Sequence, residues 1–395
     1  MTDKNLINKK AEQLQNDLVK WRRKIHKNPE LGFKEYGTSN FIAEKLTEFG
    51  IEYDRVCETG IVGLIRGGKP GKTLAIRADI DALALTEKND VTYKSQNKGA
   101  MHACGHDGHT AILLGTAKLL SEMKEDLKGN VKLIFQPAEE GPGGAEPMVE
   151  AGVMEDPKVD YIIALHINPG IEAGKVGVKE GILLAAPDSF EITVKGKGAH
   201  GARPEEGVDP ITIGSQIVIG LQQIKSRETK ALNPLVISVG SFHSGEAFNA
   251  IPEEAKIAGT VRTFDNKLRK RVKKRIEEVV KNITKAFNAD YDYKYDFYYP
   301  PAYNDPKVTE LMRQVIRDKL GENSLYEIPE PSMGGDDFAY FVQKTPGTYM
   351  RLGTKNKKKG ITNSLHSPFF NIDEDILKQG VKLFVHGTLK ILDEG

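Results

Sequence analysis

Three histidines and one cysteine lie within a single short stretch of the chain, residues 101–109. The stretch contains His102, Cys104, His106 and His109, although the whole chain has only nine histidines and two cysteines. Thiolate sulfur and neutral imidazole nitrogen are strong ligands for divalent metals of intermediate softness, and a Cys and a His two residues apart can bind one ion from a loop. The spacing of Cys104 and His106 therefore indicates a metal site.

Segments further along the chain carry groups that could complete such a site. Glu139 and Glu140 follow one apolar strand-like run, His166 follows another, and His366 lies nearer the C-terminus. Adjacent residues of an extended segment point in opposite directions, so one glutamate could bind metal while the other acts as a general base. Together these groups favour a metal-dependent hydrolase.

Each feature also has a simpler interpretation that the residues alone leave open. Cys104 and His106 could be a buried thiol and a helix-capping histidine, and the two glutamates could be an exposed acidic pair. Asp79 and Asp81 follow Arg77 at the expected end of a strand. They could form a structural ion pair, or one of them could orient a metal-bound histidine.

The order of the expected elements predicts an α/β fold. Up to about residue 186, strand-like runs such as 131–135 and the wholly apolar 161–165 alternate with helical spacing, which is typical of a mostly parallel sheet flanked by helices. Asp79, Glu139 and His166 each follow the expected end of a strand. Sites in open α/β sheets form outside the carboxyl ends of the strands, so we expect these groups to meet there.

The pattern changes between residues 187 and 299. Strand, helix, two strands, helix and strand follow one another, which is the ferredoxin-like βαββαβ motif. We therefore expect a catalytic domain made of 1–186 and 300–395, with 187–299 inserted as a second domain. The insertion carries His200 and Asn249 in loops.

Arg262 lies on a strand of the same insertion. His200, Asn249 and Arg262 could all be ordinary surface residues. An arginine can also hold a substrate carboxylate with two hydrogen bonds, so a binding role for Arg262 stays open.

Composition narrows the class of protein. The 395 residues are 39 % hydrophobic and 28 % charged, as expected for a soluble globular protein, and the net charge of +1 argues against nucleic acid or an anionic membrane as partner. No run of apolar residues is long enough to span a membrane. The N-terminus has no apolar signal core, and two cysteines make no disulfide framework, so we expect a cytoplasmic protein.

Short segments, in order along nearly the whole chain, resemble the M20 family of metallopeptidases and amidohydrolases. The similarity is strongest to the branch of aminoacylases, hippurate hydrolases and IAA-amino acid hydrolases. The matching segments are 77–83, 102–110, 135–140, 198–204, 248–252, 259–262, 334–339 and 365–369. Ala84 stands where the family usually has proline, and Asp336 where it usually has glutamate, which leaves fine substrate preference open.

The resemblance implies a catalytic domain that holds two divalent metal ions per subunit, Zn²⁺ or Mn²⁺, with Co²⁺ also possible. It further implies that the inserted domain is a lid through which a homodimer can form. The positions that match the metal ligands of the family are Cys104, His106, Glu140, His166 and His366.

The resemblance also implies roles in catalysis. Glu139 matches the general base, and Asp81, like Asp79, matches a carboxylate that supports the metal ligands. His200 matches a lid histidine that polarises the scissile carbonyl. Two further positions, Asn249 and Arg262, match contacts to the substrate carboxylate.

The expected reaction is hydrolysis of a small-molecule N-acyl amino acid, with an acetyl, benzoyl or other acyl group, to a carboxylate and a free amino acid. The alternatives are a dipeptidase or aminopeptidase of the same family, and a non-catalytic protein that binds metal or an amino-acid conjugate. The last alternative predicts a missing ligand or base, and none is missing from this sequence.

Overall fold

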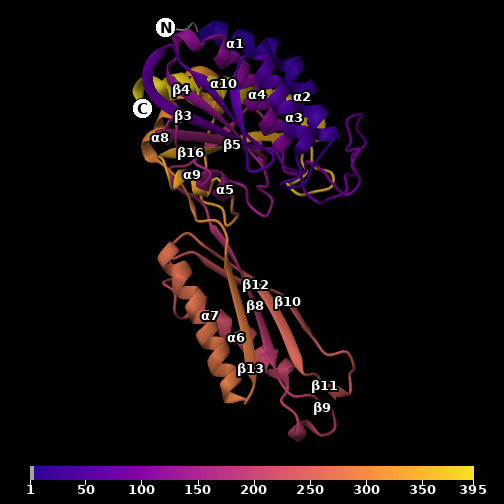
Figure 1. Cartoon of the computed structure of the whole chain (residues 1–395). Helices are drawn as coiled ribbons and strands as arrows, with labels where there is room; N and C mark the ends of the chain where they lie inside the picture. Colours follow the sequence, from indigo (N-terminus) through magenta and orange to yellow (C-terminus); the bar gives the residue numbers. More distant parts are fainter. Residues whose placement is uncertain (1–3) are drawn as a thin grey trace. The chain divides into compact units, whose positions relative to one another are not determined.

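The computed structural model describes residues 4–395 and divides the chain into two compact units, coloured along the sequence in Figure 1. Unit 1 comprises Met1–Leu183, Tyr303–Glu330 and Asp337–Gly395, and unit 2 comprises Leu184–Ala302 and Pro331–Asp336. The expected insertion, 187–299, lies within unit 2. The sequence pattern did not indicate that Pro331–Asp336 joins it from further along the chain.

A sheet of eight strands forms the centre of unit 1. Its strands are β1 (Glu52–Val56), β2 (Gly60–Arg66), β3 (Lys69–Asp79), β4 (Lys128–Gln136), β5 (Tyr161–Glu172), β6 (Val176–Val178), β15 (Leu325–Glu327) and β16 (Gly347–Lys355). They lie in the order β1-β2-β4-β3-β5-β16-β6-β15. The run β4-β3-β5-β16 is parallel throughout, which confirms the predicted mostly parallel sheet.

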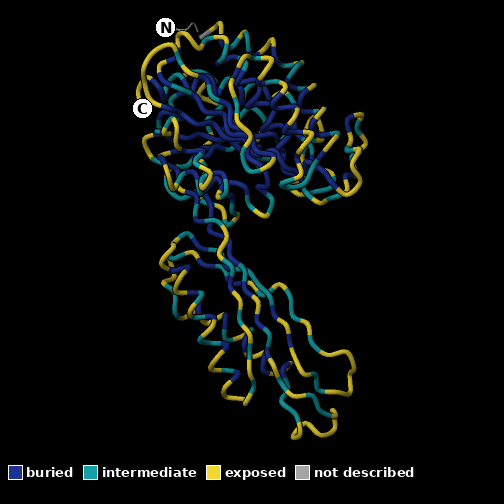
Figure 2. Tube along the Cα trace, in the orientation of Figure 1, coloured by how far each residue is buried: buried dark blue, intermediate teal, exposed yellow. Residues whose placement is uncertain are grey.

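Helices cover this sheet. They are α1 (Lys4–Gln13), α2 (Gln15–Lys27), α3 (Tyr36–Glu48), α4 (His106–Glu122), α5 (Ala145–Glu150), α8 (Pro306–Val315), α9 (Ala339–Val342) and α10 (Leu377–Glu394). α4 and α10 pack closely where α10 has Gly380. A Cβ atom at this position would lie only 2.6 Å from Ile112 Cδ1 of α4, so a larger residue would not fit. The central strands are buried along almost their whole length (Figure 2), as their apolar sequences predict. No helix among residues 4–395 is long and apolar enough to cross a membrane.

Strand β5 is longer than the sequence predicted. The apolar run suggested an end at Leu165, but the strand continues to Glu172. The polar continuation stays extended because it remains paired with β16, Ile167 with Leu352 and Glu172 with Lys355. His166 therefore lies inside a strand rather than in a loop after one.

Unit 2 has the predicted βαββαβ order. It consists of β8 (Ala186–Lys195), α6 (Pro210–Ser226), β10 (Leu235–Ser244), β12 (Glu254–Thr263), α7 (Asn266–Ala286) and β13 (Asp290–Phe297). The strands form an antiparallel sheet in the order β10-β12-β8-β13. Two short strands, β9 (Ala199–His200) and β11 (Ala250–Ile251), pair separately. Along the chain, β7 (Gly181–Leu184) precedes these elements and β14 (Ala302–Asn304) follows them.

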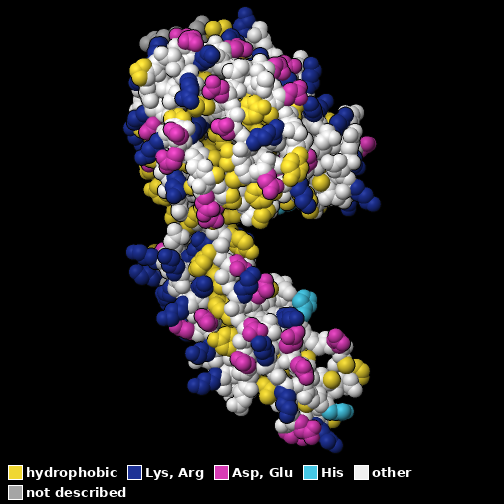
Figure 3. Space-filling view, viewed as in Figure 1, with side chains coloured by type: hydrophobic (Ala, Val, Ile, Leu, Met, Phe, Trp, Pro, Cys, Tyr) yellow, Lys and Arg dark blue, Asp and Glu magenta, His cyan; other side chains and the backbone are white. Residues whose placement is uncertain are grey.

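Helix α7 shows how the sequence pattern forms this unit. Leu268, Val272, Ile276 and Val280 recur at intervals of four residues and are buried in the core of unit 2. The lysines of the helix lie on its other faces, where basic side chains gather at the surface (Figure 3).

A buried ion pair joins β8 to α7 within unit 2. The carboxylate of Asp188 is fully buried and accepts a hydrogen bond from Arg269 Nε at 2.8 Å and from the Tyr295 hydroxyl at 2.7 Å. Removing one partner of a buried pair leaves the other charge without compensation, which costs much more than the loss of an exposed pair.

The Asp188→Ala variant is therefore expected to lose about 3–5 kcal/mol of unfolding free energy. Asp292→Ala is the control, because Asp292 pairs with Lys195 at 2.7 Å in an exposed position. That change should cost about 0–1 kcal/mol. Urea denaturation followed by circular dichroism measures both, and equal midpoints for the two variants would contradict the importance of the buried pair.

Candidate metal centre

The carboxyl ends of the parallel strands in unit 1 bring the predicted residues together. Asp79 is the last residue of β3, Glu139 and Glu140 follow β4 by a few residues, and His166 lies in β5. Cys104 comes just before α4, whose first residue is His106. The site therefore forms at the edge of the sheet where the sequence predicted it.

Glycines allow α4 to approach β5 closely at this point. Gly105 forms the turn between Cys104 and His106. Its φ is 94°, a backbone conformation that residues with a Cβ atom rarely adopt. A Cβ atom on Gly108 would lie 2.6 Å from Ile167 Cδ1. The glycines of the 101–109 stretch thus hold the turn that carries Cys104 and His106 against the strand that carries His166.

Two groups of potential ligand atoms share one residue. In each group the side-chain donor atoms all lie within 4.8 Å of one another. The groups are Cys104 with His106 and His166, and Cys104 with Glu140 and His366. All five residues that the sequence predicted as ligands are therefore brought together, with the sulfur of Cys104 common to both groups.

Individual distances agree with this arrangement. Cys104 Sγ lies 3.4 Å from His166 Nε2, and His366 Nε2 lies 3.2 Å from Glu140 Oε1. His366 reaches the site from a loop and has a φ of 62°, an uncommon conformation for a residue other than glycine. Such strained residues cluster at functional sites, where surrounding structure holds them in place.

Hydrogen bonds fix the orientation of two of these histidines. His106 Nδ1 donates to the backbone oxygen of Asp81 at 3.0 Å, and His166 Nδ1 donates to the backbone oxygen of Ile167 at 2.7 Å. Each ring thus turns Nε2 toward the cluster, which is the orientation that metal-ligating histidines have. His106 Nε2 is buried and has no hydrogen-bond partner, so the site has an acceptor that a cation would satisfy.

The electrostatics of the cluster also fit a bound cation. Burial, Glu140 and Glu139 raise the pKa of the Cys104 thiol well above its usual value, so thiolate forms there only with a cation nearby. Burial alone would lower the pKa of His106, but the carboxylates of Asp79 and Asp81 raise it to about 10. This excess of negative charge is what a divalent ion would balance.

Burial and the nearby cationic groups hold the pKa of His166 well below its usual range. The imidazole of His166 is therefore neutral near pH 7, and neutral imidazole is the form that binds metal.

Asp79 supports this arrangement without joining either of the two groups. Burial would raise its pKa, but Arg77, His106 and His109 hold it well below the usual range. Arg77 Nη1 donates to Asp79 Oδ2 at 2.6 Å, and His109 Nδ1 donates to Asp79 Oδ1 at 2.5 Å. The other nitrogen of His109 accepts the backbone N–H of Ile167, next to His166, at 2.8 Å.

For His109 the sequence predicts a structural or supporting role beside the expected metal ligands, and its contacts with Asp79 and Ile167 agree with that role. It follows His106 by three residues on α4, and residues three apart lie on the same face of a helix. The face of α4 on which His109 lies was therefore predictable. Its contacts with Asp79 and with the backbone of β5 were not, because they join distant segments of the chain.

Three buried carboxylates hold the loop that carries the two glutamates. The amide N–H of Ala138 donates to Glu35 at 2.9 Å, that of Glu140 to Asp81 at 2.9 Å, and those of Gly144 and Ala145 to Asp337 at 3.0 Å each. Ala138 has a φ of 54°, so the backbone just before Glu139 is strained and needs such support.

Sequence reasoning missed Glu35 and assigned no role to Asp337. Glu35 lies 103 positions from Ala138, and its second carboxylate oxygen accepts the Thr59 hydroxyl at 2.6 Å. No local pattern links segments so far apart. Asp81 was predicted, and the structure places it between His106 and the backbone of Glu140.

The remaining predicted residues lie in unit 2. His200 pairs with Ala250 across β9 and β11, and Gly201 N donates to the backbone oxygen of Asn249 at 2.8 Å, so His200 and Asn249 are close neighbours. His200 Nδ1 accepts the N–H of Ala202 at 3.0 Å, which leaves Nε2 as the N–H donor of this exposed ring. Arg262 is half-buried on β12.

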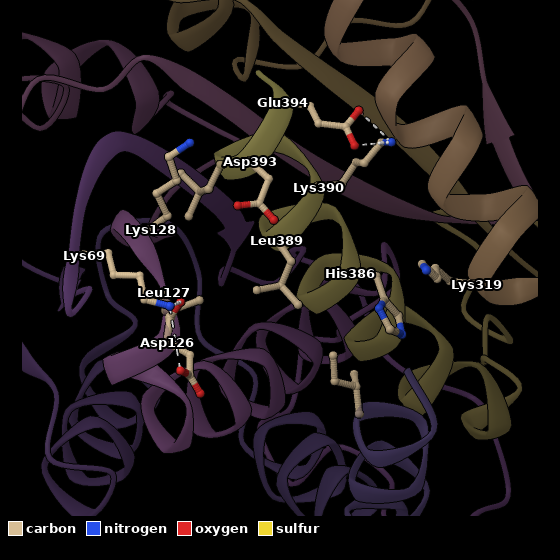
Figure 4. Close-up of a pocket in the computed structure, with 12 residues that line it drawn as sticks. Lys69, Asp126, Leu127, Lys128, Lys319, His386, Leu389, Lys390, Asp393 and Glu394 are labelled. Atoms are coloured by element: carbon tan, nitrogen blue, oxygen red, sulfur yellow. Dashed lines mark hydrogen bonds and ion pairs between the residues drawn. The ribbon is translucent and has the colours of Figure 1, made fainter. Parts of the chain in front are cut away.

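A separate hollow of about 500 Å³ opens at the other ends of the same strands. It is lined by Lys69 and Lys128, the first residues of β3 and β4, and by the last turns of α10 (Figure 4). Its lining combines lysines and acidic residues with apolar side chains that include Leu127 and Leu389. None of the predicted ligands or catalytic residues lines it, so the chemistry belongs to the opposite edge of the sheet.

Comparison with known proteins gives concordant results. Residues 75–389 match the model of Peptidase family M20/M25/M40. The chain is 44 % identical to thermostable carboxypeptidase 2 of Saccharolobus solfataricus, over 96 % of this chain and 98 % of that protein. It is 48 % identical to an N-acyl-L-amino acid amidohydrolase of Geobacillus stearothermophilus, over 68 % of this chain and 73 % of that protein.

A solved structure agrees with the sequence matches. The crystal structure of a dinuclear metal-binding peptidase of family M20 from Bacillus subtilis matches with a TM-score of 0.84 at 35 % identity, over 97 % of this chain and 99 % of that one. These matches confirm the resemblance drawn from the sequence motifs. The chain belongs to peptidase family M20/M25/M40 and is a hydrolase of amide bonds.

Proposed function

We propose that the protein hydrolyses the amide bond of N-acyl amino acids to a carboxylic acid and a free amino acid. The observation that carries the proposal is the pair of ligand groups sharing Cys104, with the carboxylate of Glu139 beside them. The similarity to an N-acyl-L-amino acid amidohydrolase supports the choice of substrate class.

The chemistry of the donor set fits two divalent ions. Cys104 would be shared, His106 and His166 would complete one site, and Glu140 and His366 the other. A thiolate favours Zn²⁺, whereas carboxylate and imidazole also suit Mn²⁺ or Co²⁺. When bound, such ions lower the pKa of a coordinated water and polarise the substrate carbonyl.

Glu139 is the proposed general base. Its carboxylate is buried, and Oε2 lies 3.9 Å from His106 Nε2. Glu139 therefore faces the cluster without belonging to either of the two groups that share Cys104. Glu139 would take a proton from the attacking water and later deliver it to the nitrogen of the leaving amine.

Unit 2 would supply the substrate contacts. His200, whose Nε2 is an N–H donor, would hydrogen-bond the oxygen that becomes negative during attack, from its own subunit or from a partner subunit. Asn249 and Arg262 would hold the α-carboxylate of the substrate. In this proposal residues 187–299 act as a lid and as the contact surface of a homodimer.

Peptide cleavage is a second candidate, favoured by the similarity to a thermostable carboxypeptidase. In a peptide, the nitrogen of the C-terminal residue is acylated by the residue before it, as the nitrogen of an N-acyl amino acid is acylated by its acyl group. The two activities therefore require the same bond cleavage and differ only in the size and charge of the acyl part.

The decisive experiment uses protein stripped of metal and refilled with Zn²⁺, Mn²⁺ or Co²⁺. A panel of N-acetyl, N-benzoyl and longer N-acyl amino acids is compared with dipeptides by measuring release of the free amine. Metal-dependent cleavage with higher kcat/KM on N-acyl amino acids supports the proposal. Higher kcat/KM on dipeptides supports the peptidase. Absence of amine release from every substrate by metal-loaded protein contradicts both.

The Glu139→Gln variant should lose about 10²–10⁴-fold in kcat, because the amide cannot accept the proton of water. Metal content, measured by elemental analysis, should stay near that of the unmodified protein. Glu146→Gln, an exposed change on α5 close to the same loop, is the control and should leave kcat unchanged. A Glu139→Gln variant that keeps most of its activity would remove Glu139 as the base.

Glu35 provides a test of the loop that positions Glu139. Glu35→Ala removes the acceptor of the Ala138 N–H and should lower kcat by about 10–100-fold, because small displacements of a catalytic group are costly. Glu35→Gln keeps an acceptor oxygen and should recover most of the loss. Metal content and KM should change little in both variants. An unchanged kcat in folded Glu35→Ala protein would show that Glu35 serves stability alone.

A further inference from the structure

One arginine of unit 1 lies next to the ligand cluster. Arg351 on β16 is in register with His166 on the neighbouring parallel strand β5. Residues in register on adjacent strands, about 4.8 Å apart, send their side chains to the same face of the sheet. Arg351 therefore leaves the sheet on the side where His166 approaches Cys104.

Aromatic packing fixes the guanidinium of Arg351. Its Cζ lies 4.4 Å from the centre of the Tyr349 ring, and that ring lies 6.3 Å from the ring of His166 in an edge-to-face arrangement. On the other side of β16 the residue in register is Gly177, which has no side chain to cover the guanidinium. One face of the guanidinium is thus held against the Tyr349 ring, and Arg351 as a whole is half-buried.

Two fully buried arginines of unit 1 each meet a carboxylate. Arg22 pairs with Asp107 at 2.6 Å and Arg77 with Asp79 at 2.6 Å. In the part of the chain that the structure describes, no carboxylate lies within ion-pair distance of the Arg351 guanidinium, and no side-chain or backbone oxygen accepts from it. A guanidinium has five N–H donors, and leaving them unpaired in a half-buried place is costly.

We propose that Arg351 binds a second anionic group of the substrate, a carboxylate in addition to the α-carboxylate. The inference rests on the proposed function, in which Asn249 and Arg262 already account for the α-carboxylate. A guanidinium matches a carboxylate with two parallel hydrogen bonds, which suits Arg351 to this task. The substrate class is then N-acyl amino acids with two carboxylates, carried either by the amino-acid side chain or by the acyl chain.

Matched substrate pairs separate these two sources. N-acetyl-glutamate and N-acetyl-glutamine differ only in a charged against a neutral side chain. N-succinyl-leucine and its succinamoyl analogue differ in the same way at the acyl end. The metal-loaded protein should favour the charged member of one pair in kcat/KM by about 10–100-fold, as expected for a charge-assisted, bidentate contact.

Variants of Arg351 test the residue directly. Arg351→Met keeps much of the apolar stem and should abolish the preference, while kcat/KM on the neutral member changes less than about threefold. Arg351→Lys keeps the charge without the bidentate geometry and should give an intermediate preference. Lys355→Met removes a positive charge from the same strand and should leave the preference intact.

Two results would overturn the inference: no preference in either pair, or a preference that Arg351→Met retains. Calorimetric titration of the metal-loaded Glu139→Gln variant, with and without Arg351→Met, measures the same discrimination between N-acetyl-glutamate and N-acetyl-glutamine with turnover suppressed. Binding that favours the charged ligand only when Arg351 is present supports the inference even where no amide is cleaved. Lack of cleavage of every N-acyl amino acid would instead overturn the proposed function.

Discussion

Concentrated negative charge at one edge of the sheet is the constraint on which the rest of unit 1 depends. Glu139, Glu140, Asp79 and Asp81 lie together with the thiol of Cys104 in a buried place. Uncompensated charges there would be very costly. Arg77 compensates part of this charge through its contact with Asp79, and the carboxylates of Asp79 and Asp81 raise the pKa of His106. A divalent cation would balance the remainder.

Buried carboxyl groups also hold the backbone around the site in place. Glu35, Asp81 and Asp337 are buried carboxyl groups that each accept backbone amides of one loop, and Asp337 also pairs with Arg77 at 3.2 Å. The amide N–H groups stabilise these carboxyl groups and are themselves fixed in position in return. The strained backbone at Ala138 can therefore be maintained, and Glu139 is held by a framework that spans three distant segments of the chain.

The sequence could predict what short-range patterns specify. Rare residue types identified Cys104, His106 and His366, and apolar runs identified the strands whose ends form the site. It could not predict contacts that arise only when distant segments meet. The extension of β5 past Leu165 depends on β16, and Glu35 acts on a residue 103 positions away, so neither leaves a local signal.

Arg351 shows why such contacts matter for specificity. Its position follows from the register of β16 against β5, which buried apolar neighbours such as Met350 and Leu352 fix. A different side chain at this position would change the charge beside His166 without moving the strand. Metal binding depends on residues that converge from several segments, whereas the charge presented to the substrate at this point depends on one side chain. Substrate preference at this edge can therefore differ between proteins that have the same residues at the proposed metal centre.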